Sequence, residues 1–440
     1  MNRSHVPTKP TTRVVLAGAI GNIVEWYDFG LYGLLAPVLA TLFFPSHDKI
    51  AALLAVYGGF AIGFAVRPLG AIVLGRVGDR QGRKFVLILS VVLMGAATVA
   101  IGLLPPYTAI GIWAPILLIA IRLFQGFSVG GEFVGSVTYL VETAPQNRRG
   151  IAGSVANIGA TIGMLIAAGA AALATSHASA FRDLWRVPFL FGGVLAIAGY
   201  MLRRQLPPDP ADAEAAKPTR APAGKSSAGE RWPALQAFRQ APRTMLFALL
   251  FASGYGVSNY LVMVFLPTFA HEFAHVSDAA ALRINTAGQA LVLLVAPLAG
   301  WASDRYLTRR TMLALAFALQ AAVTWASFTW VAHLGLPGLW ATQMLLAGLL
   351  AVVMGAAPAM LAEQFERGYR VSAHALVLNL GIGIAGGTAP MVGVALIRAT
   401  GSNMAPAAYL ALACVASAIA ALFLIDRSRK PLEQSDTVTR

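Results

Sequence analysis

Cysteine is almost absent from this sequence, and charged side chains are scarce. Cys414 is the one cysteine among 440 residues, so the chain cannot form an internal disulfide, and a cysteine-ligated metal site is not expected. Asp, Glu, Lys and Arg make up 12% of the residues, whereas soluble domains carry about 25%. Because 57% of the residues are hydrophobic, the composition excludes an ordinary soluble domain and indicates a protein that crosses a membrane many times.

The sequence also lacks a Walker loop, the motif that binds the phosphates of ATP. Segments 381–386 (GIGIAG), 271–275 (HEFAH) and 126–130 (GFSVG) match the dinucleotide, HExxH and Gly-x-Ser-x-Gly patterns in spelling, but they lie within or at the end of expected hydrophobic spans, without the strand–turn–helix context that the first and third patterns need. The absence of a Walker loop argues against ATP coupling within this chain, and we predict a protein that is not an enzyme and uses no cofactor or metal. A membrane-embedded acyl- or glycosyltransferase is a less favoured alternative. Such an enzyme needs a catalytic His or paired carboxylates near an interface, and His271 and His275, at the outer end of the seventh span, are expected to lie in a loop.

Hydrophobic runs of about 20 residues allow about twelve membrane spans. The expected spans are 13–40, 50–76, 84–104, 112–141, 150–175, 186–203, 243–270, 284–303, 310–332, 338–361, 372–398 and 404–425. Proline, alanine and mixed charges fill the longest polar interruption, which indicates a linker. We therefore expect an N-terminal bundle over 1–203, a cytoplasmic linker over 204–242, and a C-terminal bundle with a short cytoplasmic tail over 243–440.

The net charge of +14 suggests a nucleic-acid partner at first sight. If the N-terminus is cytoplasmic, however, most of the 33 Lys and Arg residues fall on the cytoplasmic side of the expected spans. This asymmetry is the positive-inside rule. It predicts a multi-pass protein of the cell inner membrane with both termini cytoplasmic, in contact with the lipid bilayer and not with nucleic acid.

An internal repeat supports the division into two halves. Gly75-x-x-x-Asp79-Arg80 follows the second span, and Gly300-x-x-x-Asp304-Arg305 follows the eighth. Related halves are typical of secondary transporters, whose binding site lies where the halves meet.

Two carboxylates, Glu25 and Asp28, lie in the middle of the first span. Three residues apart, they share one helix face, and an acid at this depth is a candidate functional group by default. One interpretation is proton uptake and release coupled to a substrate; the other is a pair of acids held by hydrogen bonds or a neighbouring Arg. Glu132, in the fourth span, is a further proton candidate or a structural partner for arginines.

Several motifs resemble known transporters. Gly75-x-x-x-Asp79-Arg80-x-Gly82-Arg83-Lys84 resembles the signature loop of the major facilitator superfamily. Three other segments resemble its metabolite:proton symporter branch, namely 25–29 (EWYDF), 67–70 (RPLG) and 122–132 (RLFQGFSVGGE). The resemblance implies an all-α membrane protein with twelve transmembrane helices in two pseudo-symmetric six-helix bundles.

The resemblance also implies roles for particular residues. The first, fourth, seventh and tenth spans line the cavity of this superfamily, so Arg122 is expected to bind a substrate carboxylate or to neutralise Glu25 or Asp28. The other expected substrate contacts are Gln125, Tyr32, Asn259, Tyr260 and Arg67, of which Arg67 has an equal claim to gating. The residues expected to control conformation are Asp79, Arg80, Arg83, Asp304 and Arg305.

These observations predict a proton-coupled symporter that imports a small carboxylate-bearing metabolite, such as a di- or tricarboxylate, by alternating access. Its partners would be this metabolite and protons, and we expect a monomer. A proton-coupled transporter of zwitterions such as proline or betaine is the first alternative. A drug:proton antiporter is less favoured, because the fifth span lacks the Gly-Pro pattern of those proteins.

Overall fold

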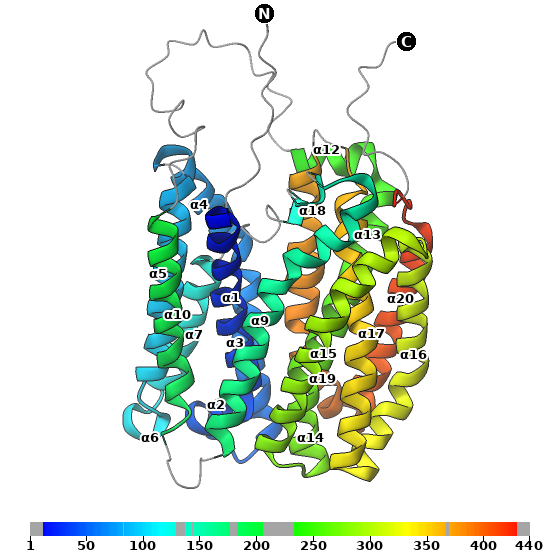
Figure 1. Cartoon of the computed structure of the whole chain (residues 1–440). Helices are drawn as coiled ribbons and strands as arrows, with labels where there is room; N and C mark the ends of the chain where they lie inside the picture. The colour runs from blue at the N-terminus through cyan, green and yellow to red at the C-terminus, as the bar shows by residue number, and fades with distance from the viewer. Residues whose placement is uncertain are drawn as a thin grey trace, which may run out of the picture.

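The structure is a computed structural model that describes residues 12–81, 83–128, 137–138, 140–142, 144–176, 183–205, 233–366 and 369–428. Helices and short connections account for all of these residues, and no strand occurs among them (Figure 1). Ten of the described helical segments are long and apolar enough to cross a membrane, and a bent pair of helices makes an eleventh. The all-α membrane fold expected from the sequence is therefore confirmed.

The first half contains eight α-helices of at least eight residues, the single-turn α6 and one 3-10 turn among its described residues. These elements are α1 (Thr12–Leu34), α2 (Ala36–Phe43), α3 (Lys49–Ala65), α4 (Arg67–Gln81), α5 (Arg83–Leu103), α6 (Tyr107–Ile110), α7 (Trp113–Ser128), η1 (Gln146–Arg148), α9 (Arg149–Ser176) and α10 (Arg186–Arg204). The 16-residue α7 covers the start of the fourth expected span, 112–141. Most of the remainder of that span, including Glu132, lies outside the described residues.

The second half begins with a short helix that falls inside the expected linker. Its elements are α12 (Pro233–Gln240), α13 (Pro242–Tyr260), η2 (Leu261–Phe265), α14 (Leu266–Ala274), α15 (Asp278–Arg305), α16 (Arg309–Leu334), α17 (Leu336–Ala362), α18 (Arg370–Leu378), η3 (Asn379–Gly386), α19 (Gly387–Thr400) and α20 (Ala405–Phe423). Both η2 and η3 are π-helical.

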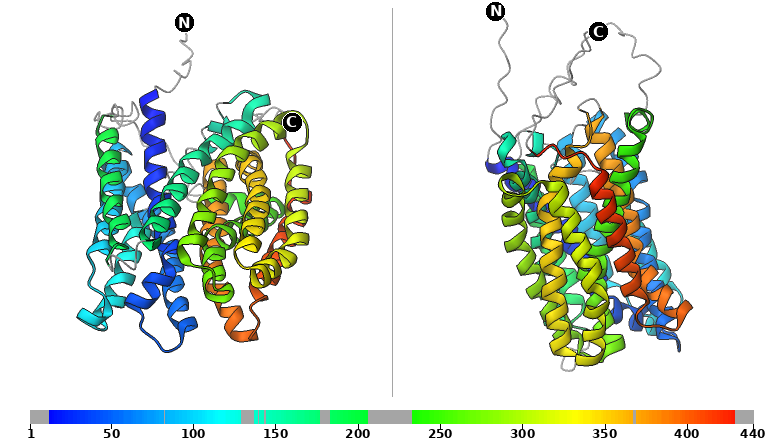
Figure 2. Two further views of the ribbon diagram at one scale, coloured as in Figure 1. Left: turned by 60° about the horizontal axis from the view of Figure 1, so that its bottom comes forward. Right: turned by 90° about the vertical axis from the view of Figure 1, so that its right-hand side faces the viewer.

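The helices run roughly side by side between two ends of the molecule (Figure 1). α1 begins and α20 ends at the same end, which we call the terminal end; α4, α12 and α18 also lie there. α2, α6 and α14 lie at the other end, the far end. α5 and α10 form one flank, α16 and α20 form the other, and α9 and α15 pack together between them (Figures 1 and 2).

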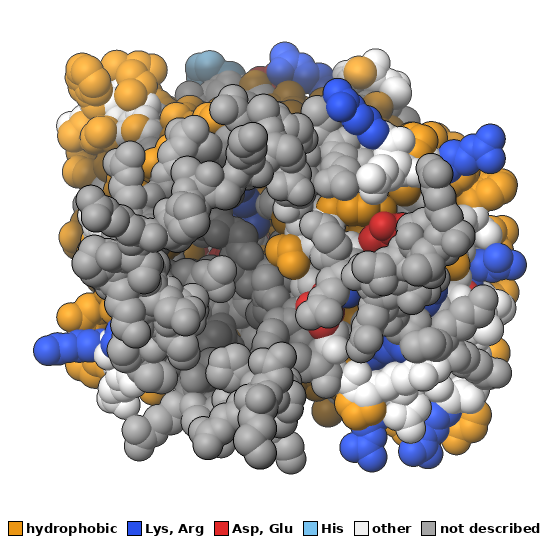
Figure 3. Space-filling view, turned by 90° about the horizontal axis from the view of Figure 1, so that it is seen from above, with side chains coloured by type: hydrophobic (Ala, Val, Ile, Leu, Met, Phe, Trp, Pro, Cys, Tyr) orange, Lys and Arg blue, Asp and Glu red, His pale blue; other side chains and the backbone are white. Residues whose placement is uncertain are grey.

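Large apolar side chains face outward along the helices. Leu173, Leu294 and Leu412 are each at least two-thirds exposed. In water such a surface is unfavourable, whereas in a bilayer it faces lipid tails, and the helices satisfy their own backbone groups. Viewed onto the terminal end, described Lys and Arg side chains lie around the edge, next to hydrophobic side chains (Figure 3).

Two of the expected spans each consist of two helices. α1 and α2 meet at Leu35 with a bend of 63°, so the span expected over 13–40 is not one straight helix. The second span divides at Val66, because Pro68 lacks a backbone N–H and restricts the preceding residue. Arg67 is consequently the first residue of α4, and this helix continues to Gln81, beyond the end expected at residue 76.

Candidate functional site

Asp28 is buried in the middle of the first half. Its side chain is 1% exposed, and its Oδ1 accepts hydrogen bonds from Thr98 Oγ1 of α5 at 2.6 Å and from Gln125 Nε2 of α7 at 2.7 Å. The carboxylate of α1 is thus held by two neighbouring helices. A buried acid with this many donors can stay ionised without water, provided that a cation is near.

Arg122 supplies that cation. Its Nη1 lies 3.5 Å from Asp28 Oδ2 and donates to Gln125 Oε1 at 2.8 Å. The guanidinium carbon lies 4.3 Å from the ring centre of Tyr32 and 4.7 Å from that of Phe29, so aromatic faces cover the charge. The structure therefore brings four predicted residues together, but Arg122 is fully buried and faces Asp28. Direct contact between Arg122 and a substrate stays a prediction for another conformation.

Glu25 pairs with the other intramembrane arginine. Arg67 Nη1 lies 3.4 Å from Glu25 Oε1, and both side chains are nearly buried. The Arg67 guanidinium also lies over the rings of Phe29 and Phe64, at 4.2 and 4.3 Å. One helical turn of α1 therefore contributes both carboxylates, each facing an arginine from a different helix.

Tyr260 links this region to the second half. It is 1% exposed, lies at the end of α13, and stacks on Trp26 of α1 with ring centres 6.5 Å apart. It also packs against Phe60 and Phe64 of α3, at 5.7 and 5.3 Å. The Tyr260 hydroxyl finds no hydrogen-bond partner among the described residues. The interface between the halves is thus aromatic at this depth.

A small cavity lies between the halves beside Trp26. Its volume is about 40 Å³, and a water molecule needs about 10–15 Å³ by the same measure. The described side chains that line it are uncharged: Trp26, Val137, Asn157, Ala160, Thr161, Met164, Tyr255, Asn259, Gln289, Met354, Pro358, Leu361, Leu378 and Ile382. Residues from both halves therefore enclose a space with amide, hydroxyl and aromatic groups.

Sequence reasoning found only part of this lining. Asn259 was expected there and lines the cavity, whereas Tyr260 stacks on Trp26 and is not among the lining residues. Asn157 and Thr161 of α9 were missed. Their signal was two polar residues four apart in an otherwise small and apolar helix, which places them on one helix face.

Several helices of the second half are irregular where they reach the cavity. Asn259 and Tyr260 directly precede the π-helical η2, Ile382 belongs to the π-helical η3, and Pro358 lies inside α17. π-helical turns occur frequently at functional sites, and transporters bind substrates at interrupted helices. The irregularities support this cavity as the functional centre.

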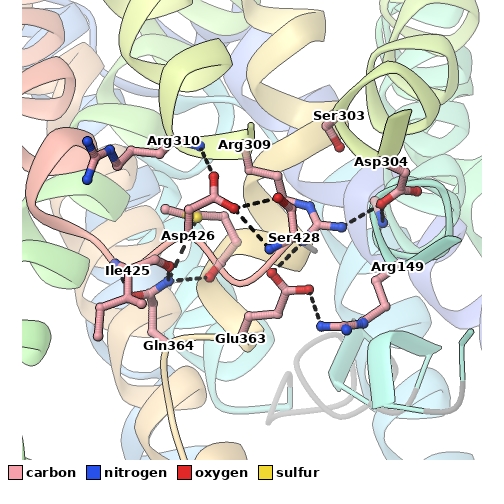
Figure 4. A network of polar contacts seen from close by, with 12 residues as sticks. Arg149, Ser303, Asp304, Arg309, Arg310, Glu363, Gln364, Ile425, Asp426 and Ser428 are labelled. Carbon is pink, nitrogen blue, oxygen red and sulfur yellow. Dashed lines mark hydrogen bonds and ion pairs between the residues drawn. The ribbon is translucent and has the colours of Figure 1, made fainter. Parts of the chain in front are cut away.

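A polar network joins the halves at the terminal end (Figure 4). Asp304, at the end of α15, accepts hydrogen bonds from the backbone N–H of Gly150 at 2.8 Å and of Ile151 at 3.1 Å, where α9 begins. Glu363 accepts from Arg149 of the first half at 2.7 Å and from Arg309 of the second at 2.5 Å. Asp304 therefore contacts the other half, and its role in conformational change stays a prediction.

None of the other residues expected to control conformation is described in contact with the opposite half. Arg305 is exposed and lies over the ring of Trp301, 5.4 Å from its centre. The side chains of Asp79, Arg80 and Arg83 and the whole of Glu132 lie outside the described residues. A second cross-half ion pair joins Glu142 to Arg370 at 2.6 Å, next to a hydrogen bond of 3.0 Å between Thr138 and His374.

The halves also touch at the far end. Tyr57 Oη of α3 lies 2.8 Å from Thr268 Oγ1 of α14, and the Tyr57 and Phe265 rings are 6.3 Å apart. Asp48 and Arg398 approach to 3.3 Å. The halves are therefore in contact at both ends of the molecule in this conformation.

Comparison with known proteins agrees with this architecture. A model of the sugar (and other) transporter family matches residues 14–211, and a model of the major facilitator superfamily matches residues 252–439. The chain is 31% identical to an ectoine/proline transporter of Corynebacterium glutamicum, over 97% of this chain and 86% of that protein. It is 30% identical to a proline/betaine transporter of Escherichia coli, over 96% of this chain and 85% of that protein.

Solved structures show the same fold at lower identity. A D-xylose-proton symporter superimposes with a TM-score of 0.74 at 17% identity, over 96% of this chain and 99% of that one. The human organic anion transporter MFSD10 gives a TM-score of 0.61 at 17% identity, over 94% and 100%. The two family models and the relatives aligned along almost the whole chain show that the protein belongs to the major facilitator superfamily, in its metabolite:proton symporter branch.

Proposed function

We propose that this transporter is a proton-coupled symporter that imports a small zwitterion, such as proline or a betaine, by alternating access. The names of its relatives, which are ectoine/proline and proline/betaine transporters, support zwitterions over the di- or tricarboxylate that Arg122 first suggested. The described residues that line the cavity are uncharged, which agrees with a substrate whose own charges sum to zero.

One observation carries the proposal. A single turn of α1 places Trp26 on the cavity wall and places Glu25 and Asp28 against Arg67 and Arg122. Any rotation or tilt of this turn changes the cavity and both ion pairs together. Binding of a substrate and of a proton would therefore be linked through one structural element, and such linkage is reciprocal.

The ion pairs suggest how a proton acts. Protonation of Glu25 or Asp28 removes one charge from a buried pair and leaves an arginine without its counter-ion. The helices that hold the pair then favour a different packing, which is the two-state element that alternating access requires. Glu132 stays a third proton candidate. In the same cycle the contacts of Asp304 and Glu363 would break when the terminal end opens.

The distribution of Lys and Arg residues supports a proposed orientation in the membrane. Lys and Arg residues of the connections at the terminal end support a cytoplasmic location for that end and for both termini, in the cell inner membrane. The two halves, 1–203 and 243–440, would then rock about the cavity as a monomer, connected by the cytoplasmic segment 204–242.

Reconstitution into liposomes tests the proposal. An inward proton gradient should drive labelled proline or glycine betaine to accumulate above its external concentration, and a protonophore should abolish the accumulation. Citrate and α-ketoglutarate serve as the contrasting cargo. Gradient-driven accumulation of these acids without uptake of either zwitterion would overturn the proposal.

A further inference from the structure

We propose that the bound zwitterion lies across the two halves, with its carboxylate accepting hydrogen bonds from Gln289 and Asn259 of the second half and its cationic nitrogen against the indole face of Trp26 of the first. This inference rests on the proposed function. It adds an orientation for the substrate and a role for Gln289.

Two polar side chains of α9 on the cavity wall are bound to the backbone. Asn157 Nδ2 donates to the carbonyl of Met354 at 3.0 Å, and Thr161 Oγ1 donates to the carbonyl of Asn157 at 3.0 Å. These hydrogen bonds hold both side chains in place.

Gln289 and Asn259 differ from them. Gln289 is 3% exposed, lies on the cavity wall, and its Nε2 finds no hydrogen-bond partner among the described residues. A buried N–H group without an acceptor is unfavourable, so such a group in a native protein calls for an explanation. Asn259, 8% exposed and on the same wall, also makes no hydrogen bond to a described residue. Two side-chain amides, from α15 and α13, thus offer hydrogen-bond donors on the wall of one cavity.

Trp26 faces the same cavity from α1. Its ring stacks on the ring of Tyr260, with ring planes 19° apart. The face of a tryptophan attracts a quaternary or protonated amine, and more strongly where water is excluded. The sulfur atoms of Met164 and Met354 add polarizable surface nearby. A cationic nitrogen is therefore favoured on the side of the first half.

The orientation gives the substrate a mechanical role. A ligand held by α1 at one end and by α13 and α15 at the other draws the two halves together over the cavity. Only a molecule with both groups makes both contacts, so a compound with one of them should bind weakly and fail to stabilise the conformation in which the halves are in contact at both ends.

The test compares ligands that carry one or both groups. Dissociation constants of glycine betaine and of choline, which has the quaternary ammonium without the carboxylate, are measured by calorimetry on the full-length protein in detergent. Gln289→Leu should weaken betaine binding by about 10- to 100-fold, the loss expected for a hydrogen bond to a charged group. It should leave choline binding within about twofold, because choline has no carboxylate to lose.

Trp26 is tested with the same two ligands. Trp26→Leu should weaken betaine and choline by similar factors, and Trp26→Phe should retain part of the affinity because a ring remains. Thr286→Val is the matched control: it lies one turn from Gln289 on α15 but not on the cavity wall, and its hydroxyl donates to the backbone carbonyl of Leu282 at 2.8 Å, so both constants should stay within about threefold. If Gln289→Leu does not fold, Asn259→Ala carries the same prediction for betaine against choline.

Two results would overturn the inference alone. One is unchanged betaine affinity in the Gln289 or Asn259 variant; the other is an equal loss for betaine and choline, which indicates general damage to the site. If the wild-type protein binds neither betaine nor proline, the proposed function fails and the inference fails with it.

Discussion

The carboxylate of Asp304, in the second half of the transporter, accepts a hydrogen bond of 2.8 Å from the backbone N–H of Gly150, in the first half. Gly150 lies at the start of α9, where backbone N–H groups have no partner inside the helix and the helix dipole favours a negative charge. A Cβ on Gly150 would lie 2.4 Å from the carbonyl oxygen of Gly300. Asp304 thus caps a helix of the opposite half, where the two backbones are in contact.

Asp304→Asn should shift the terminal end toward its open conformation. The amide keeps the size of the side chain but removes the charge that faces the helix start and Arg309. Losing charged hydrogen bonds costs about 1.5–3 kcal/mol, which corresponds to about a 10- to 100-fold change in the ratio of open to closed molecules. Spin labels at Arg148→Cys and Arg305→Cys, in a Cys414→Ala background, report the distance across this end.

Asp278→Asn is the control for that experiment. Asp278 lies at the other end of the same helix and contacts His271, so the distance at the terminal end should not change. An unchanged distance distribution in Asp304→Asn would show that the cap does not hold the halves together.

Glu363→Gln should destabilise the folded protein. Glu363 is fully buried and faces Arg149 and Arg309, whose guanidinium groups are also buried. Removing one partner of a buried ion pair costs about 3–5 kcal/mol, because a buried charge is left without compensation. Thermal unfolding in detergent should show a fall in Tm of several degrees, whereas Glu366→Gln, at an exposed position nearby, should change it little. Equal Tm values for the two variants would contradict the buried network.

Gly256→Ala should disrupt the packing of α13 against η3. A Cβ there would lie 2.7 Å from Ile382 Cα and 3.0 Å from Gly386 Cα, and backbone atoms cannot move aside as side chains do. Overpacking of this kind costs about 1–3 kcal/mol. Gly169→Ala is the matched control, since the nearest atom to its Cβ is Thr286 Cγ2 at 3.9 Å. A lower Tm is expected only for the Gly256 variant. Equal Tm values for the two variants would contradict backbone contact between α13 and η3 at Gly256.

Asp426→Asn should lower stability in a pH-dependent way. Burial alone would raise the pKa of Asp426, but hydrogen bonds from Ser428 and from the backbone N–H of Arg310 outweigh burial and hold the pKa below its usual value. A carboxylate with a lowered pKa in the folded state stabilises the protein above its unfolded pKa of about 3.9, and this contribution disappears as the pH falls through the folded pKa.

The Asp426 effect is measured as a Tm difference from the wild type. Asp426 accepts from the backbone N–H of Arg310 at the start of α16 and so acts as a helix cap. At pH 7 the loss of stability should be about 1 kcal/mol, as for other helix caps. The loss should shrink as the pH falls below about 4, the unfolded pKa of an aspartate. The exposed Asp183, paired with Arg186, provides the comparison, because Asp183→Asn should have almost no effect at any pH. A Tm difference for Asp426→Asn that grows on acidification would contradict a lowered pKa for this carboxylate.

Sequence reasoning located the spans and the ionisable residues, because hydropathy and charge are local properties. The Gly-x-x-x-Asp-Arg repeat drew attention to Asp304, which contacts the other half, and the spacing of Glu25 and Asp28 predicted that they share one helix face. The sequence did not predict which residue each of these groups contacts. Whether Arg122 faces Asp28 or the cavity depends on the rotation of α7 against α1, which spacing along one helix does not determine.

The cavity wall was harder to predict for a related reason. Asn157, Thr161 and Gln289 come from α9 and α15, and their importance arises only where these helices meet α1 and α13. The π-helical segments η2 and η3 shift the faces of their helices relative to a regular α-helix. A span drawn as a regular helix therefore assigns its later residues to the wrong faces.

The most direct test of proton coupling is gradient-driven uptake by Glu25→Gln and Asp28→Asn in liposomes. Proline exchange without a gradient measures binding and the movement of the halves, and accumulation under an inward proton gradient measures coupling. We predict that at least one variant retains exchange but loses accumulation, because its α1 turn can no longer exchange a proton. Full gradient-driven accumulation of proline by both variants would contradict a role for these carboxylates.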